Sequence, residues 1–368
     1  MMKKLLGFIC AVLVLIPLSP AQAADRVVRI TSPAHQTFNG QFRNDDLAQE
    51  LTPSGRLGTL VFTPKVANTT WVIDAALIDE VIAMTGEYEL VSKSPTIGKD
   101  IATAWLKQLR QITYGQQVVA LAYGNPDVSL AKKLAPSELK NYFSYGKSQL
   151  EIALGRTVRS EPNGGWSIGK SRLNNQLRKG YSDNRKALTR LSKVVTDPQL
   201  TAVRAKLAKL LSPQLDKASR QYFSYSARLA TDAFVHKLRI NSGKYQITTS
   251  NVKLPVTVIN EFDSDVTVDV ALLPINSRVI VDSFQGVTIP ARSKKQLEMQ
   301  VEVIAPGQTT VSAFITDEKS NDVVPEATLT LNSTVIDSRV TWFTTGAAIL
   351  LLLAAVAQSL RRVRKRSQ

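Results

Sequence analysis

Two acidic residues, Asp74 and Asp127, occupy positions where acid–base chemistry is readily built. Asp74 ends the strand-like run TTWVID and precedes a helix-like run, while Asp127 follows the apolar run VVALAYGNP. Parallel α/β sheets place active sites at the carboxyl ends of strands, and glycoside cleavage requires two carboxylates ~5 to 9.5 Å apart. An Asp before a helix is also a common N-cap, and Asn-Pro-Asp a common turn. We favour these structural roles, and keep the pair as catalytic candidates of a carbohydrate-active, glycosidase-like domain.

Side chains for metal or triad chemistry are scarce. The two histidines, His35 and His236, are far apart in the chain, and the single cysteine, Cys10, lies in the N-terminal apolar stretch. A metal site or a Ser-His-Asp triad needs such side chains at workable spacing. We therefore predict no metal, no cofactor and a non-catalytic protein.

Positive charge is concentrated in one segment of the chain. The formal net charge of +16 comprises 0 over residues 24–146, +13 over 147–240 and −4 over 241–339, with the remainder at the two ends. Such a segment binds anionic wall polymer or lipid headgroups, or simply forms solvated helix faces. The candidate binding residues are Arg172, Arg178, Lys179, Arg185, Lys186 and Arg190. We expect no nucleic-acid partner, because the chain ends described below indicate export.

Alternating strands and helices are expected to position the two carboxylates. Apolar, β-branched runs over residues 56–62, 69–74 and 116–124 predict three parallel strands. The runs over 75–85 and 99–112 predict the helices between the second and third. We therefore predict a small parallel α/β domain, partial barrel-like in type, over residues 24–150.

Two further segments have different periodicities. Helices are expected from about residue 137, and residues 151–243 form the basic helical segment. Its Gly-rich run SEPNGGWSIGKS is assigned to a loop, and we expect no phosphate loop of the GxxxxGK[S/T] kind in the chain. Residues 244–337 alternate with period two in about seven short runs, which predicts an antiparallel, immunoglobulin-like β-sandwich.

One short sequence occurs twice, as NYFSYGKS at 141–148 and QYFSYSAR at 221–228. A duplicated helix that presents an aromatic face to sugar rings would explain it. Two core-facing aromatic clusters, or chance, would explain it equally, and we favour this second explanation.

The two ends of the chain indicate export. Residues 1–23 have a basic start, an apolar stretch and a small-x-small end, typical of a signal peptide. Residues 340–360 carry no charge and predict a transmembrane helix, and the basic tail 361–368 predicts a cytoplasmic end. We therefore expect a single-pass cell-membrane protein with its N-terminal bulk outside.

Several runs resemble a known family when taken in order. They are NDDLAQELTPSGRLGTLV (44–61), TWVIDAALIDEV (70–81), AWLKQLR (104–110), VVALAYGNPDVSL (118–130) and LPVTVINEFDSDVTVDVALLP (254–274). The chain is similar to actinobacterial secreted, membrane-anchored envelope proteins of unknown function, whose genes often lie beside that of the lipid II flippase MurJ. This chain looks like a short member. The resemblance implies an envelope setting and supplies no reaction.

The function expected from these features is binding or scaffolding of cell-wall components, or of the membrane proteins that synthesise the wall. The topology and the localised charge support this expectation. Two alternatives remain: a carbohydrate-active domain that uses Asp74 and Asp127, and a regulator that acts on a membrane partner through its span.

Overall fold

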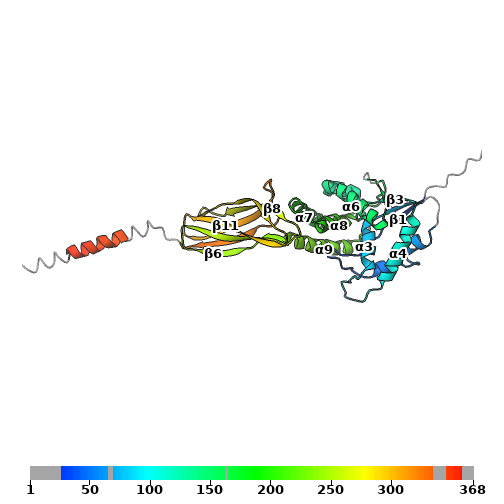
Figure 1. Ribbon diagram of the computed structural model, residues 1–368, viewed down its shortest axis with the longest axis horizontal. Helices are drawn as coiled ribbons and strands as arrows, with labels where there is room; N and C mark the ends of the chain where they lie inside the picture. The colour runs from blue at the N-terminus through cyan, green and yellow to red at the C-terminus, as the bar shows by residue number, and fades with distance from the viewer. Residues whose placement is uncertain (1–25, 65–68, 162–164, 335–344, 359–368) are drawn as a thin grey trace, which may run out of the picture.

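The computed structural model describes residues 26–64, 69–161, 165–334 and 345–358. Figure 1 shows the α/β and helical parts together at one end of a long molecule, followed by a region of β-strands. The predicted signal peptide (1–23) and basic tail (361–368) lie outside the described residues.

A four-stranded parallel sheet of order β1-β2-β3-β4 forms the centre of the N-terminal part. The strands are β1 (Arg26–Ile30), β2 (Thr69–Ile73), β3 (Gln117–Ala120) and β4 (Arg159–Ser160). The accompanying helices are α1 (Asp46–Leu51), α2 (Arg56–Phe62), α3 (Ala75–Thr85), α4 (Gly98–Thr113), α5 (Val128–Leu134) and α6 (Pro136–Leu154). The sheet is open, which corrects the expected barrel-like character, because four strands cannot close on themselves.

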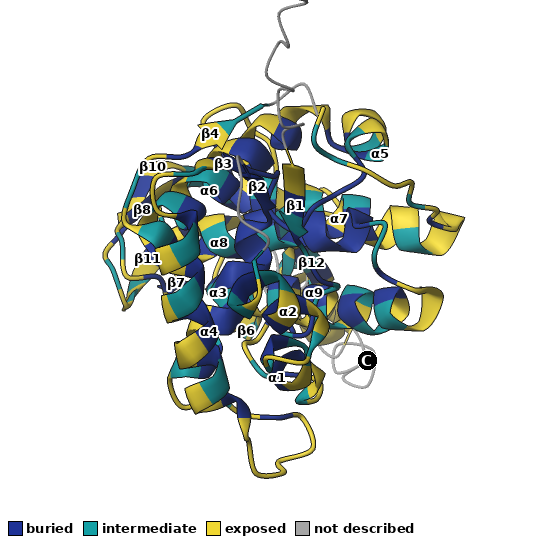
Figure 2. Cartoon of the chain, turned by 90° about the vertical axis from the view of Figure 1, so that its right-hand side faces the viewer, coloured by how far each residue is buried: buried dark blue, intermediate teal, exposed yellow. Residues whose placement is uncertain are grey.

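Alternate residues of the central strands pack on opposite faces of this sheet. Trp71 and Ile73 of β2 join the large core that contains residues of α1 to α4. Val72 and Val119 face the other way and pack with Trp166, which belongs to the Gly-rich loop. Figure 2 shows buried residues gathered at β2 and β3, with the exposed residues on outer helix faces. The Gly-rich loop therefore helps to cover a sheet face.

The strand predicted over residues 56–62 is a helix, α2. Leu57 and Val61 are both fully buried, and they lie four residues apart, which is one helical turn. Gly58 packs against Thr52, so closely that a Cβ atom at Gly58 would overlap the carbonyl oxygen. The apolar composition suggested a strand, but Leu57 and Val61 are buried at helical spacing, and Gly58 allows α2 to pack closely on the end of α1.

The basic helical segment consists of α7 (Asn175–Leu191), α8 (Pro198–Lys206), the 3-10 helix η1 (Leu207–Leu211) and α9 (Lys217–His236). Helix α6 crosses the predicted boundary at residue 150, and β4 carries the chain back to the parallel sheet. The helical segment is thus continuous with the α/β part.

Nine strands among the described residues form the β-sandwich. They are β5 (Leu238–Ile240), β6 (Gly243–Ile247), β7 (Asn251–Asn260), β8 (Val266–Pro274), β9 (Val279–Val281), β10 (Phe284–Ile289), β11 (Ser293–Val303), β12 (Gly307–Thr316) and β13 (Ala327–Ser333). One sheet has the order β10-β8-β12-β13-β6 and the other β5-β7-β11-β9. Sheets of five and four strands give the strand number of a variable-type immunoglobulin domain. Strands β13 and β6 pair in parallel, whereas the sequence pattern predicted only antiparallel pairs.

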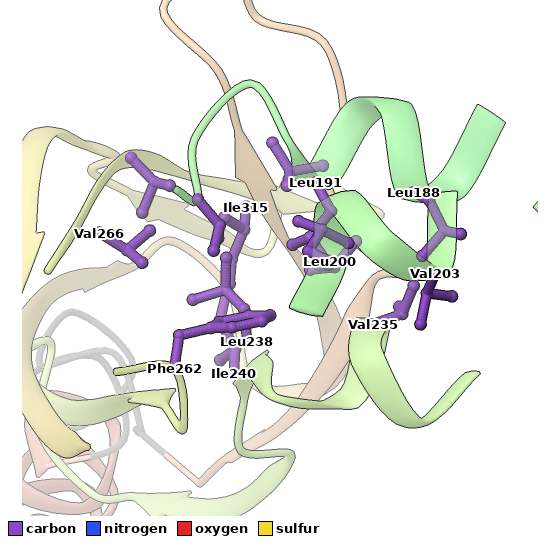
Figure 3. Close-up of a cluster of buried hydrophobic side chains, with 14 of the residues drawn as sticks. Leu188, Leu191, Leu200, Val203, Val235, Leu238, Ile240, Phe262, Val266 and Ile315 are labelled. Atoms are coloured by element: carbon purple, nitrogen blue, oxygen red, sulfur yellow. The ribbon is translucent and has the colours of Figure 1, made fainter. Parts of the chain in front are cut away.

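The helical segment and the sandwich share one hydrophobic core. Leu191 of α7 and Val235 of α9 belong to the same buried cluster as Leu238 of β5 and Phe262 of the sandwich. Figure 3 shows these side chains converging where the helices meet the strands. Only Lys237 separates α9 from β5. The helical segment and the sandwich are therefore joined by a one-residue connection as well as by the shared core.

The transmembrane helix predicted over residues 340–360 is corrected by the structure. A helix covers residues 345–358, and no helix within the described ranges is long and apolar enough to cross a membrane. The apolar composition of residues 340–360 predicted the span, and both ends of that range lie outside the described residues.

Candidate functional site

Asp74 caps α3 at the carboxyl end of β2. Its Oδ1 accepts hydrogen bonds from the amides of Ala76 (3.0 Å) and Gly124 (2.9 Å). Gly124 has φ +74° and lies against the backbone of Lys209, where a Cβ atom would clash. Burial raises the pKa of Asp74 to about 7, against the opposing effect of the two amide hydrogen bonds. The carboxylate therefore ties β2 to the loop after β3.

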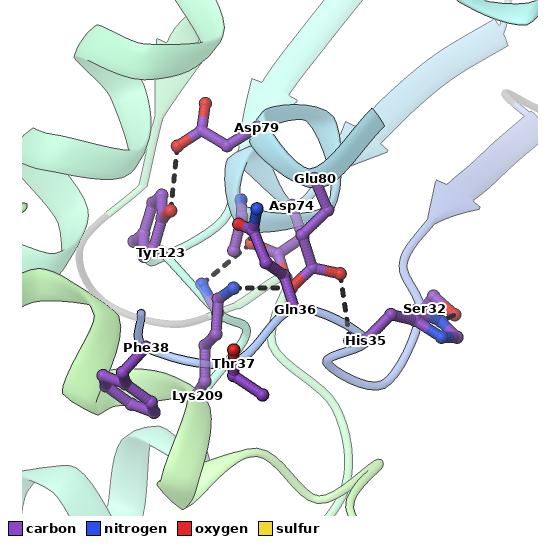
Figure 4. A network of polar contacts seen from close by, with 12 residues as sticks. Ser32, His35, Gln36, Thr37, Phe38, Asp74, Asp79, Glu80, Tyr123 and Lys209 are labelled. Carbon is purple, nitrogen blue, oxygen red and sulfur yellow. Dashed lines mark hydrogen bonds and ion pairs between the residues drawn. The ribbon is translucent and has the colours of Figure 1, made fainter. Parts of the chain in front are cut away.

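A closed polar network surrounds Asp74. Glu80 of α3 pairs with Lys209 of η1 at 2.6 Å, and the other Glu80 oxygen accepts the amide of His35 at 3.1 Å. Asp79 accepts the hydroxyl of Tyr123 at 2.8 Å, and burial raises the pKa of Asp79. Figure 4 shows side chains from the N-terminal loop, α3 and η1 meeting here. The network joins three parts of the chain.

The cavity beside Asp74 is too small for a substrate. Ser32, Asp74, Glu80 and Lys209 are among its lining residues, and it holds about 10 Å³ of space for water. That is about the volume one water molecule needs, and far below a ligand pocket of roughly 300 to 1,000 Å³. The network therefore has the features of a structural contact between segments of the chain and lacks the space of a catalytic cleft.

Asp127 has a separate structural position as the N-cap of α5. One carboxylate oxygen accepts the amides of Ser129 (3.0 Å) and Leu130 (3.2 Å), and the other accepts the amide of Ser171 (2.9 Å). Asp74 and Asp127 share no hydrogen-bond partner among the described residues. Each carboxylate is held by its own set of backbone amides.

Within the described ranges, no group of three or more His, Cys, Asp or Glu side chains is placed to hold a metal ion. His35 is buried, and its Nε2 is hydrogen-bonded to Ser32 Oγ at 3.1 Å. His236 lies at the end of α9, where its Nδ1 is hydrogen-bonded to the Asp232 carbonyl at 2.6 Å.

A groove at the starts of α7 and α9 is lined by positive charge. Its charged residues are Lys170, Arg172, Lys217 and Arg220, and Asn174, Leu177, Pro213 and Leu215 complete the lining. We call it the basic groove. It encloses about 430 Å³ and has no carboxylate in its lining. Four cations in a lining that has no carboxylate favour an anionic ligand.

Arg220 is buried in this groove and is 4 % exposed. Its guanidinium donates to the carbonyls of Ser212 (2.8 Å) and Leu215 (2.7 Å), and to the Ser171 hydroxyl. No ion pair joins it to a carboxylate among the described residues, although the charge of Asp216 opposes the lowering of the Arg220 pKa by burial. A buried cation surrounded by neutral oxygens leaves positive potential in the groove.

The start of helix α7 reinforces this potential. Helix α7 begins after Asn174, which lines the groove, whereas the start of α9 is capped by the carboxylate of Asp216, which accepts the amide of Ser219 at 2.9 Å. A helix start carries roughly half a positive elementary charge from its aligned peptide dipoles. The cationic side chains and the start of α7 therefore favour an anionic ligand.

The structure divides the six predicted basic residues. Arg172 lines the basic groove, while Arg178, Lys186 and Arg190 are exposed on α7 outside its lining. Lys179 pairs with Asp183 at 2.7 Å. Arg185 is half-buried near the hydroxyl pair of Tyr142 and Tyr181, which are 2.8 Å apart. Lys170, Lys217 and Arg220 were missed.

One sequence signal would have found part of this groove. Residues 164–171, GGWSIGKS, have the GxxxxGK[S/T] spacing of phosphate-binding loops, which the loop assignment overlooked. The strand β4 precedes the run, but α7 begins only at Asn175, whereas in a P-loop the GK[S/T] residues open the helix. The match is therefore incomplete as a nucleotide site, but it places Lys170 in the basic groove.

Comparison with known proteins gives a family without an assigned function. The family of unknown function DUF6049 matches residues 161–367, which is more than half of the chain. The chain belongs to this family. The DUF6049 match contains the basic groove and the sandwich, while Asp74 and Asp127 precede it. No curated protein matches the sequence.

Three similar solved structures each cover about a quarter of the chain. WR4, an MSP family member of C. elegans, is 13% identical and covers 27% of this chain and 98% of its own, with a TM-score of 0.20. The PapD-like domain 7 of human CEP192 is 9% identical, covers 27% of this chain and 87% of its own, and has a TM-score of 0.21. The secreted serine protease VesC of Vibrio cholerae is 11% identical, with 26% and 23% covered and a TM-score of 0.21. Scores this low carry no functional argument.

Proposed function

We propose that this protein is a non-catalytic, exported envelope protein that binds phosphate groups of an anionic wall polymer in the basic groove. The observation that carries the proposal is the groove itself, with four cationic side chains and no acidic residue in its lining. The net charge of +13 over residues 147–240 supports the same conclusion at longer range.

Phosphate and a discrete polymer fit the groove better than a lipid surface. Arg220 lies at 4 % exposure, beyond the reach of a flat membrane surface. Lys170, Arg172 and Lys217 line the same groove, so several anionic groups of one polymer segment can be bound there.

The envelope setting rests on the sequence. The resemblance to actinobacterial envelope proteins encoded beside the lipid II flippase MurJ, and the signal-peptide pattern of residues 1–23, support a place outside the cytoplasm. Scaffolding of wall-synthesis proteins is compatible with polymer binding. The glycosidase alternative loses support, because the cavity at Asp74 admits only about one water molecule.

A binding assay with matched variants tests the proposal. The full-length protein is titrated with poly(glycerol phosphate) at low and high salt. Triple alanine substitution of Lys170, Arg172 and Lys217 should weaken binding ~10- to 100-fold, because each exposed charge contact contributes up to ~1 kcal/mol. Higher salt should weaken wild-type binding as the charges are screened.

The control removes the same charge elsewhere on the helical segment. Triple alanine substitution of Arg178, Lys186 and Arg190, which are exposed and lie outside the groove lining, should leave affinity within about threefold of wild type. Equal losses in the two triple variants would refute the groove in favour of diffuse charge. Binding to phosphatidylglycerol vesicles without binding to the polymer would refute the polymer as the ligand.

A further inference from the structure

A second depression continues from the basic groove along α7 and α9. It encloses about 670 Å³, and we call it the furrow. Leu177 lines both the furrow and the basic groove, so the two adjoin. The volume lies in the range of small-molecule sites, roughly 300 to 1,000 Å³. A ligand group held in the groove can therefore extend into the furrow.

The furrow has a fixed direction because α7 and α9 run the same way. Near their starts, the Arg220 guanidinium donates to the carbonyl of Arg172 at 3.4 Å. Near their ends, Leu191 and Val235 enter the core shared with the sandwich. The furrow therefore leads away from the groove toward the sandwich.

The charges in the furrow pair with one another, unlike those in the groove. Lys179 pairs with Asp183 at 2.7 Å, and Arg228 with Asp232 at 3.6 Å. All four residues line the furrow. Their signs cancel, which favours a neutral polar ligand group here and an anionic group in the groove.

The remaining furrow residues suit a sugar ring. Tyr225 of α9 is 61% exposed, and its flat ring offers apolar area with a polar hydroxyl. Asn184, Gln221 and Ser224 also line the furrow and supply amide and hydroxyl groups. A sugar presents an apolar face and a rim of hydroxyls, and this set of side chains complements both.

Gly180 keeps the furrow open from the α7 side. It lies inside the helix, where glycine lowers stability relative to alanine. A Cβ atom at Gly180 would meet nothing within 4 Å, so no packing within the protein requires a glycine there. Gly180 lines the furrow, and its missing side chain allows a ligand to approach the helix backbone.

The repeated sequence YFSY distinguishes this furrow from its counterpart on α6. Tyr145 of the first copy also lines a depression, of about 390 Å³, but its ring is half-buried and packs edge-on against Tyr123 at 5.0 Å. Gly146 is pressed against the carbonyl of Leu121. Only the second copy, with Tyr225, presents an exposed ring beside an open glycine.

We propose that the furrow is a carbohydrate subsite that holds a sugar residue of the same polymer whose phosphate lies in the basic groove. The sugar packs on Tyr225 and over Gly180, and Asn184, Gln221 and Ser224 bond its hydroxyls. This inference rests on the proposed function and narrows the ligand to a glycosylated, phosphate-bearing polymer.

Two matched polymers test the subsite in the full-length protein. One is bare poly(glycerol phosphate), and the other is the same polymer substituted with N-acetylglucosamine. Wild type should bind the substituted polymer at least about tenfold more tightly. Tyr225→Ala and Gly180→Leu should abolish this preference and leave the affinity for the bare polymer unchanged. Tyr114→Ala, which removes an 81% exposed tyrosine at the end of α4, should preserve the preference.

The outcomes separate this inference from the function on which it rests. Equal affinity of wild type for the two polymers overturns the sugar subsite and leaves phosphate binding intact. A preference retained by both Tyr225→Ala and Gly180→Leu, or lost equally in Tyr114→Ala, also overturns the subsite. Failure of wild type to bind either polymer overturns the proposed function and the subsite together.

Discussion

The buried ion pair between Glu80 and Lys209 gives a sharp test of how the α/β part is joined to the helical segment. The side chains are 2% and 6% exposed, and their charged atoms are 2.6 Å apart. Lys209→Met would leave Glu80 buried with only the His35 amide as a partner. Breaking a buried pair in this way costs about 3–5 kcal/mol. With a urea m-value of about 2 kcal/mol/M, the unfolding midpoint should fall by about 2 M.

The assay is urea unfolding followed by intrinsic tryptophan fluorescence, to which the buried Trp71 and Trp105 of the α/β part contribute. The double variant Glu80→Gln/Lys209→Met should recover most of the lost stability, because neither side chain then carries a buried charge. Lys179→Met, which breaks an exposed ion pair, should leave the midpoint unchanged. A Lys209→Met midpoint within error of wild type would refute the buried network, and so would a double variant no more stable than the single one.

Two further predictions concern the pH dependence of stability and the glycine of the furrow. Burial raises the pKa of Asp74 to about 7 from an ordinary value near 3.8, so the folded protein retains a proton that the unfolded chain releases. The contribution of Asp74 to the unfolding free energy should therefore fall as pH rises from about 4 to about 7. Asp74→Asn should reduce the difference between the urea midpoints measured at pH 4.5 and at pH 8. An equally large difference in the variant would count against the raised pKa of Asp74. Gly180→Ala should raise the unfolding free energy by up to about 1 kcal/mol, because its methyl group meets open space in the helix interior. A loss of stability in thermal unfolding of Gly180→Ala would show that this glycine has a structural role after all.

Local sequence patterns correctly predicted helices and strands whose defining contacts are between residues close in the sequence. The helix start after Asp74 follows from a carboxylate before a helical run, and the amide of Ala76 bonds to it as a cap requires. The run over 56–62 was wrongly predicted as a strand because its composition is apolar, whereas the close packing of Gly58 on Thr52 at the end of α1 exists only in the folded protein. The periodicity of apolar residues indicates the type of a single helix or strand, and it carries no information on how closely two such elements pack.

The candidate site was harder to predict, because its parts are distant in sequence. Arg220 bonds the Ser171 hydroxyl, 49 residues away, and Glu80 pairs with Lys209 across 129 residues. Charge counting identified the correct segment but favoured the run of cations on α7, most of which face solvent. Only Arg172 of those predicted residues lies in the basic groove. The GxxxxGK[S/T] spacing of GGWSIGKS is a local sequence feature that would have pointed to Lys170.

The continuity of α9 with β5 has a mechanical consequence. The chain passes from His236 to Leu238 through one residue, and Leu238 lies in the core that holds both parts together. A force applied to the sandwich would therefore be transmitted along α9 to the groove, because no flexible linker separates the two parts. The shared core and the one-residue connection limit the relative motion of the sandwich and the helices, so the groove keeps a defined orientation relative to the strands.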